Sequence, residues 1–188
     1  MRPIHPLVFA ASLGVSVFLG RERVVAEITV EVGGAPMFPS KSILENTANS
    51  KDHSVFVAGV EATDLAELLR AEGPFTVFAP VDTAFEKLPK GTIDRHMTPE
   101  SKESLTALLE YHVVRGKYSA ADLVAAVEKG GGRAELTTLQ GEALSVEQNG
   151  RKLVIIDAKG GKSVVTIPDV PERNGIVHVV DTVLLPKN

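Results

Sequence analysis

One stretch near the middle of the chain reads Thr76-Val77-Phe78-Ala79-Pro80-Val81-Asp82-Thr83-Ala84-Phe85. Residues 75–79 form a short apolar run with a proline at each end, which is typical of a buried strand. Asp82 follows at once, and its side-chain oxygen can accept a hydrogen bond from a first-turn N–H group, so we expect it to cap a brief helix. The stretch therefore predicts a strand that turns through proline into a capped helix.

The sequence before this stretch, from Ser40 onward, repeats apolar residues at helical spacing. The repeats predict three short helices. Asp52, and Thr63 or Asp64, are the expected N-caps because their side-chain oxygens can accept from exposed N–H groups. Further upstream, residues 27–38 contain a short alternating segment, a pair of glycines and two prolines. This composition predicts a linker or an accessory strand.

Two more helices are predicted after the stretch. Thr98-Pro99 is a strong helix start, because a proline at the first helical position loses no intrahelical hydrogen bond. Three leucines beyond it would form the buried face of that helix. Ser119 is followed three residues later by Asp122, which is a capping-box pattern, and the helix that it opens would stop at the glycines of 130–132.

The remainder of the chain has the pattern of strands. Asn149-Gly150 favours positive φ and predicts a hairpin between strands at 144–148 and 152–157. Further strands are predicted at 164–167 and 176–185. Because helices gather in the first half and strands in the second, we expect an α+β layout around one antiparallel core.

Composition excludes several classes of protein. The 188 residues suit one domain with a short appendage. No cysteine is present, which excludes disulfides, Cys-ligated zinc and thiol chemistry. The net charge of −4 offers no electrostatic footprint for a phosphate backbone, so nucleic acid is not an expected partner.

The first 26 residues predict an export signal. Residues 7–20 are an uninterrupted run of apolar and small residues, close in length to a signal-peptide core and short of the roughly 20 apolar residues of a membrane span. Val24-Val25-Ala26 has the small-residue pattern of a cleavage site. An uncleaved anchor, a cut elsewhere and a buried helix are the alternatives. We expect a periplasmic, secreted or cell-surface protein with no membrane span in its mature form.

Three motifs together resemble one family. Residues 76–85 resemble the first signature of fasciclin (FAS1) domains, residues 174–186 resemble the closing strand of the second signature, and Tyr111-His112-Val113-Val114 resembles the Tyr-His motif between them. The implied division is a signal peptide at 1–26, a linker at 27–38 and a single FAS1 domain at 39–188. The residues that carry the two signatures are Phe78, Pro80, Asp82, Phe85, Asn174, Gly175, His178 and Asp181.

The resemblance implies both a fold and a function. The FAS1 fold is an antiparallel β-wedge or sandwich with several short helices packed around it. The implied function is non-catalytic cell adhesion or partner binding at a cell surface, matrix or envelope, with a surface protein or polysaccharide as partner. No cofactor is expected, and the protein is expected to be a monomer. The alternative is a periplasmic or secreted protein that binds a carbohydrate or small ligand, which requires a pocket between the helices and the wedge.

The resemblance also implies two partner-binding segments. In animal members, integrin contact has been attributed to the Tyr-His segment with its aliphatic flanks and to a short acidic segment before the second signature. These segments correspond here to Leu108, Leu109, Tyr111, His112, Val113 and Val114, and to Pro168, Asp169 and Val170. The acidic segment departs from the animal pattern, since Ile167 stands where a Glu would and Pro171 follows. Tyr111 suits either a half-buried anchor or a contact surface. If it belongs to a contact surface, we expect an exposed aliphatic patch around it.

No motif predicts catalysis or a metal site. The sequence lacks HExxH and an EF-hand loop, so no metal is expected. A triad could be assembled from His112 or His178 with Asp82 or Asp181, but no GxSxG elbow supplies a nucleophile. We expect both histidines to make structural hydrogen bonds within the core. A hydrolase remains a third hypothesis and requires His112 to meet a Ser or Asp side chain in an open cleft.

Overall fold

The computed structural model describes residues 27–71, 73–89, 98 and 101–187. Its helices are α1 (Ile43–Thr47), α2 (Ser54–Glu61), α3 (Leu65–Arg70), α4 (Asp82–Glu86), α6 (Lys102–Glu110) and α7 (Ala120–Lys129). Its strands are β1 (Val30–Val32), β2 (Ala35–Met37), β3 (Phe75–Pro80), β4 (Val113–Arg115), β5 (Arg133–Thr137), β6 (Ala143–Asn149), β7 (Lys152–Ile156), β8 (Lys162–Glu172) and β9 (Gly175–Val180). The expected signal segment at 1–26 and Pro99 lie outside the described residues.

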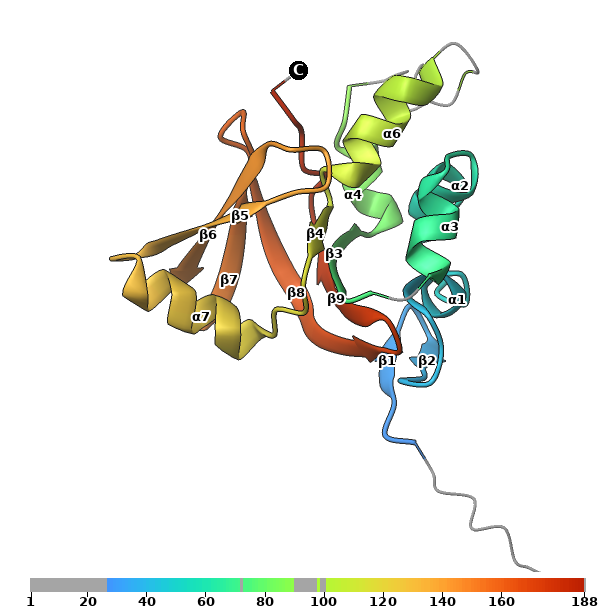
Figure 1. The fold of residues 1–188 in the computed structure, drawn as a ribbon, viewed down its shortest axis with the longest axis horizontal. Coiled ribbons are helices and arrows are strands. Elements are labelled where there is room, and N and C mark those ends of the chain that lie inside the picture. Colours follow the sequence, from blue (N-terminus) through green and yellow to red (C-terminus); the bar gives the residue numbers. More distant parts are fainter. Residues whose placement is uncertain (1–26, 72, 90–97, 99–100, 188) are drawn as a thin grey trace, which may run out of the picture.

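The strands form a large sheet of order β4-β3-β9-β8-β7-β6-β5 and a separate β1-β2 hairpin. Figure 1 shows α1, α2, α3, α4 and α6 gathered beside β3 and β9, whereas α7 lies at the opposite end of the molecule against β5 and β6. The predicted α+β layout is confirmed. The β6–β7 hairpin around Asn149-Gly150 is also confirmed, with Asn149 paired to Lys152 and Gly150 at φ 62°.

The sheet is antiparallel except for one pair of strands near the β4 edge. β3 and β9 run parallel, with Phe78 opposite His178, so the prediction of a wholly antiparallel core is wrong for this pair. The two strands are far apart in the sequence, and their direction depends on how the intervening helices and hairpins return the chain. The last strand ends at Val180, so the predicted extension to residue 185 is also wrong.

Local capping signals differ in how well they predicted the helix starts. The Ser119–Asp122 capping box of α7 is confirmed: the Asp122 N–H donates to Ser119 Oγ at 3.2 Å. Helix α2 is not capped by Asp52. Instead, the N–H groups of Ser54 and Val55 donate to the Asp82 carboxylate at 3.1 and 2.9 Å. Asp82 is therefore a helix cap, as predicted, but the helix that it caps is α2, whose first residue lies 28 positions earlier in the sequence. Helix α4, which begins at Asp82 itself, has no side-chain cap.

Residues 27–38 are not a linker. They contain the β1–β2 hairpin, and Val32 and Met37 belong to the hydrophobic core at 5% and 2% exposure. The alternative of an accessory strand is the correct one, because two alternating apolar side chains are enough to attach the hairpin to the core. Of the described residues, none belongs to a helix long and apolar enough to cross a membrane.

The hydrophobic core has two parts. The first part joins the helices α1, α2, α3 and α6 to β3 and β9, with Phe56, Leu69 and Val77 among its fully buried members. The second lies between α7 and the sheet and includes Leu123 and Ile155. The chain between α6 and β4 runs from one part to the other. The Tyr-His segment therefore contributes side chains to both parts of the core.

Candidate functional site

The Tyr-His segment is buried throughout. Its six residues are all between 0% and 4% exposed: Leu108, Leu109, Tyr111, His112, Val113 and Val114. The predicted exposed aliphatic patch around Tyr111 is therefore wrong. The reason is the position of the segment: its leucines and Val113 fill the first part of the core, while Tyr111 and Val114 fill the second. A role for this segment in partner binding stays a prediction that requires the segment to move out of the core.

Tyr111 is an internal anchor in the folded protein. Its hydroxyl donates to the Ala143 carbonyl at 3.1 Å and accepts from the Ala158 N–H at 2.8 Å. Burial raises the pKa of Tyr111 to about 12, so the hydroxyl keeps its proton. The phenol thereby joins the end of α6 to the open end of the β6–β7 hairpin, where β6 begins and β7 has just ended.

The Tyr111→Phe variant is expected to lose about 1–3 kcal/mol of unfolding free energy, because it leaves the Ala143 and Ala158 groups without their phenol partner. Urea unfolding followed by circular dichroism measures the loss. The matched control is Tyr118→Phe at the exposed tyrosine, which should change stability by less than about 0.5 kcal/mol. Equal stability of the two variants would contradict this assignment.

The two motif histidines are confirmed as structural groups of the core. His112 Nδ1 donates to the Leu108 carbonyl at 2.8 Å, and its Nε2 accepts from the Leu184 N–H at 3.0 Å. His178 Nε2 donates to the Tyr118 carbonyl at 2.8 Å, and its Nδ1 accepts from the Asp169 N–H at 3.3 Å. Burial lowers the pKa of both rings, to about 4 for His112, so both are neutral near pH 7. Each ring is fixed in one tautomer by its two backbone partners.

Asn174 and Gly175 join the first half of the chain to the last strand. Asn174 Oδ1 accepts from the Ile43 N–H at 2.9 Å, and its Nδ2 donates to the Leu69 carbonyl at 2.8 Å, so one side chain completes the hydrogen bonding of α1 and α3. A Cβ atom at Gly175 would lie 2.0 Å from the Phe75 carbonyl oxygen, so this close approach of two backbones requires glycine.

The other signature residues also serve the fold. Phe78 stacks on the His178 ring at 5.6 Å between centroids. Asp181 Oδ1 accepts from the Val164 N–H at 2.9 Å. Pro80 and Phe85 are buried.

The acidic segment is divided between surface and core. Pro168 and Asp169 are exposed, whereas Val170 is 1% exposed and belongs to the core. Asp169 has φ 58°, which is uncommon for a residue other than glycine, and lies where the register of β8 shifts. Its carboxylate accepts from the Ala120 N–H at 2.7 Å and so contributes to the start of α7.

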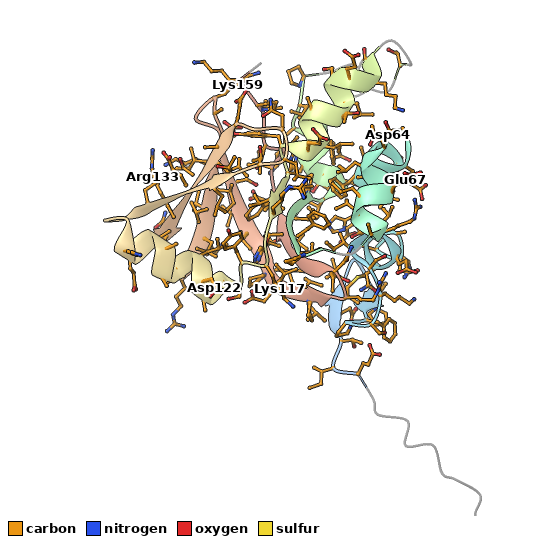
Figure 2. The ribbon with its side chains drawn as sticks, in the orientation of Figure 1. Asp64, Glu67, Lys117, Asp122, Arg133 and Lys159 are labelled. Atoms are coloured by element: carbon orange, nitrogen blue, oxygen red, sulfur yellow. The ribbon has the colours of Figure 1, made fainter. Side chains whose placement is uncertain are left out.

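Tyr118 lies next to this segment and was not among the predicted site residues. In the described part of the chain, it and Ile28 are the large hydrophobic residues with exposed side chains, at 36% and 89%. His178 holds the Tyr118 carbonyl and the Asp169 amide on its two ring nitrogens, which places both residues at the start of α7. We name Tyr118, Pro168 and Asp169 the α7-start surface. An aromatic residue directly before a capping box was the sequence signal that could have identified it. Figure 2 labels Lys117 and Asp122, which flank this surface on the outside of the molecule.

A groove of about 690 Å³ begins at the same surface and follows α7 along β7 and β8. Its lining consists of Ala120, Ala121, Val124, Ala125, Glu128, Arg151, Lys152, Leu153, Val164, Val165, Thr166 and Pro168. The helix contributes mainly alanines here, because its larger side chains Leu123 and Val127 are turned into the core. The groove is the pocket between a helix and the wedge that the alternative function requires.

The described residues do not bring catalytic groups together in the predicted way. Both ring nitrogens of His112 are occupied by backbone groups, and the side chain is 1% exposed, so it does not meet a Ser or Asp side chain in an open cleft. Asp181 binds the backbone of β8 rather than His178. Among residues 27–71, 73–89, 98 and 101–187, no group of three or more His, Asp or Glu side chains could hold a metal ion.

Comparison with known proteins identifies the family. The model of the fasciclin domain matches residues 51–186, which is most of the chain, and this protein belongs to the fasciclin domain family. The chain is similar to the protein sll1483 of Synechocystis sp., with 39% identity over 175 residues that cover 93% of this chain and 90% of the relative. It is also similar to periostin of Homo sapiens, with 32% identity over 72% of this chain but only 15% of the relative.

A solved structure confirms the predicted FAS1 fold. A FAS1 domain pair of fasciclin I, an insect cell adhesion molecule, superimposes with a TM-score of 0.71 at 22% identity and covers 85% of this chain and 58% of that chain.

Proposed function

We propose that this protein is an exported, non-catalytic adhesion or interaction module that binds a surface protein or polysaccharide at a cell surface, matrix or envelope. Membership of the fasciclin domain family carries this proposal, because the structurally similar fasciclin I is a cell adhesion molecule. The apolar run at 7–20 supports export. A single domain that includes the β1–β2 hairpin, and the monomeric state, are part of the same proposal.

The α7-start surface is the proposed contact site. Within the two predicted partner-binding segments, Pro168 and Asp169 are exposed, and Tyr118 adds an aromatic side chain to them. Aromatic residues are enriched at the centres of protein interfaces, where they bury a large area at low entropic cost. The two hydrogen bonds of His178 hold the backbone of this surface in place before a partner binds.

The Tyr118→Ser variant is expected to lower affinity for the partner at least tenfold, because it removes the one large exposed ring of this surface. The measurement is saturable binding of the purified protein to surface proteins and, separately, to polysaccharide from the envelope. Ile28→Ser is the matched control, since it removes the other exposed hydrophobic side chain, which lies just before β1, a strand that Figure 1 shows well away from α7. Equal binding by both variants and the parent would move the contact elsewhere, and no saturable binding would reject the proposed function.

Small-ligand binding is a second candidate function, favoured by the groove along α7. Its volume of about 690 Å³ lies within the roughly 300–1,000 Å³ typical of ligand sites. A carbohydrate is the less suitable ligand, because no aromatic side chain lines the groove and few polar groups there could satisfy sugar hydroxyls. The lining favours an apolar ligand.

A further inference from the structure

The walls of the groove are apolar on both sides. Helix α7 contributes Ala120, Ala121, Val124 and Ala125, and the facing strands contribute Leu153, Val165 and Pro168. Helix α7 packs on β5 and β6, and the groove runs between its alanines and β7 and β8. An apolar chain in the groove would contact both walls and remove their hydrocarbon surface from water.

The dimensions suit a ligand with one narrow chain. The lining extends along α7 from Ala120 to Glu128, which is about 12 Å at the rise of an α-helix. It involves twelve residues, whereas a stable protein interface uses roughly 20–30 residues on each side. The groove is therefore too small to be a protein interface by itself, and its volume matches a small molecule.

The charged residues at the β6–β7 hairpin end of the groove, which we call its mouth, indicate what polar group the ligand would carry. Arg151 and Lys152 are exposed at the β6–β7 hairpin, and Glu128 is the one acidic residue of the lining. Among the described residues, the ion pairs are Arg70–Glu61, Lys102–Asp64 and Arg133–Glu147. Neither Arg151 nor Lys152 takes part in any of these ion pairs. The methylene stems of Arg151 and Lys152 can extend the apolar wall while their charged ends remain in water. An anionic head group is the complement of this mouth.

We propose that the α7 groove binds a free medium-chain carboxylate, with its unbranched apolar chain between α7 and β7–β8 and its head group beside Arg151 and Lys152. This proposal deepens the second candidate function and rests on it. The ligand is a monomer from solution, bound lengthwise in the groove.

The test is calorimetric titration of the purified protein with decanoate below its micelle concentration. We expect saturable binding of one molecule per chain. Ala125→Leu should weaken it at least tenfold by filling the groove, and Arg151→Glu with Lys152→Glu should weaken it about tenfold by repelling the head group. Lys159→Glu is the control for a charge reversal outside the groove (Figure 2) and should leave binding unchanged. Binding that is absent, or insensitive to Ala125→Leu, would overturn the proposal.

Two further binding experiments distinguish failure of the proposed ligand from failure of the groove as a binding site. Anionic vesicles without free fatty acid test for docking on a membrane, and vesicle binding that Ala125→Leu abolishes would overturn the free-ligand proposal. An uncharged naphthylamine dye tests the groove itself: dye binding without decanoate binding overturns only the ligand class. If Ala125→Leu affects neither dye nor decanoate binding, the small-ligand function fails as well. Partner binding through Tyr118 is measured separately and is unaffected by either result.

Discussion

Replacing Glu172 by glutamine is expected to stabilise the protein at pH 8 and above, by a difference from the parent that grows between about pH 4.5 and 8. Glu172 is only 5% exposed at the end of β8, where the Asn46 side-chain amide donates to its carboxylate. Burial raises the pKa of Glu172 from its usual 4.5 to about 8, and the hydrogen bond from Asn46, which lowers this pKa, has the smaller effect. The folded protein therefore keeps this side chain protonated near neutral pH.

The sign follows from proton linkage. Above pH 4.5 the unfolded chain releases the proton of Glu172 while the folded chain retains it, so rising pH favours unfolding until the folded group ionises near pH 8. The difference in pKa corresponds to roughly 3–5 kcal/mol at high pH. Below pH 4.5 both states hold the proton, and the contribution vanishes.

Urea unfolding of Glu172→Gln and the parent across pH 4–9 measures this effect. Glutamine is neutral at every pH and presents an oxygen to Asn46, so the variant lacks the Glu172 slope and its advantage over the parent should grow with pH between 4.5 and 8. Glu67→Gln, at an exposed position of α3 (Figure 2), is the control and should retain the parent's slope. A difference between Glu172→Gln and the parent that does not grow between pH 4.5 and 8 would show that Glu172 is ionised in the fold.

His112→Ala is expected to destabilise the protein by about 3–5 kcal/mol. The imidazole fills space at 1% exposure and satisfies the Leu108 carbonyl and the Leu184 N–H, and alanine leaves a cavity and two buried polar groups without a partner. Thermal unfolding by calorimetry measures the loss. His112→Gln is the companion variant, because its amide can restore one of the two hydrogen bonds and should recover part of the stability. An unfolding temperature of His112→Ala within 2 °C of the parent would refute the role of the ring.

The contribution of His112 to stability also depends on pH, on the acid side of neutrality. Burial lowers the pKa of His112 from 6.5 to about 4, so its contribution is fully present above pH 6.5 and is lost as pH falls toward 4, when the unfolded chain takes up the proton first. His112→Gln should therefore be less sensitive than the parent between pH 6.5 and 4. This slope has the opposite sign to that of Glu172, so the two variants can be distinguished in one set of curves.

Both effects depend on contacts between distant residues, and this explains how far the sequence could predict them. The strand at Phe75–Pro80 and the turn at Asn149-Gly150 were predictable because neighbouring residues determine them. The structural role of His112 was also predictable from its apolar surroundings, but its partner Leu184 was not, since 72 residues separate the two. The raised pKa of Glu172 had no sequence signal, because its cause is burial at the end of β8.

The candidate site shows the same division. Pro168 and Asp169 were predicted, whereas Tyr118 was missed and the exposure of the Tyr-His segment was predicted wrongly. A tyrosine at the end of a helix is equally compatible with surface and core until the neighbouring layers are placed. The groove likewise arises from α7 lying beside strands that follow it by more than twenty residues.

The sequence by itself determined the elements, their caps at Ser119 and Asp122, the α+β class and, through its motifs, the fasciclin family. These features depend on backbone preferences and side-chain periodicity over a few neighbouring residues. Only the tertiary structure decided that β3 and β9 run parallel, that Asp82 caps α2, and that Tyr111 is buried while Tyr118 is exposed. The physical reason is that burial and long-range hydrogen bonding depend on which elements meet in space, and packing of the whole chain sets that arrangement.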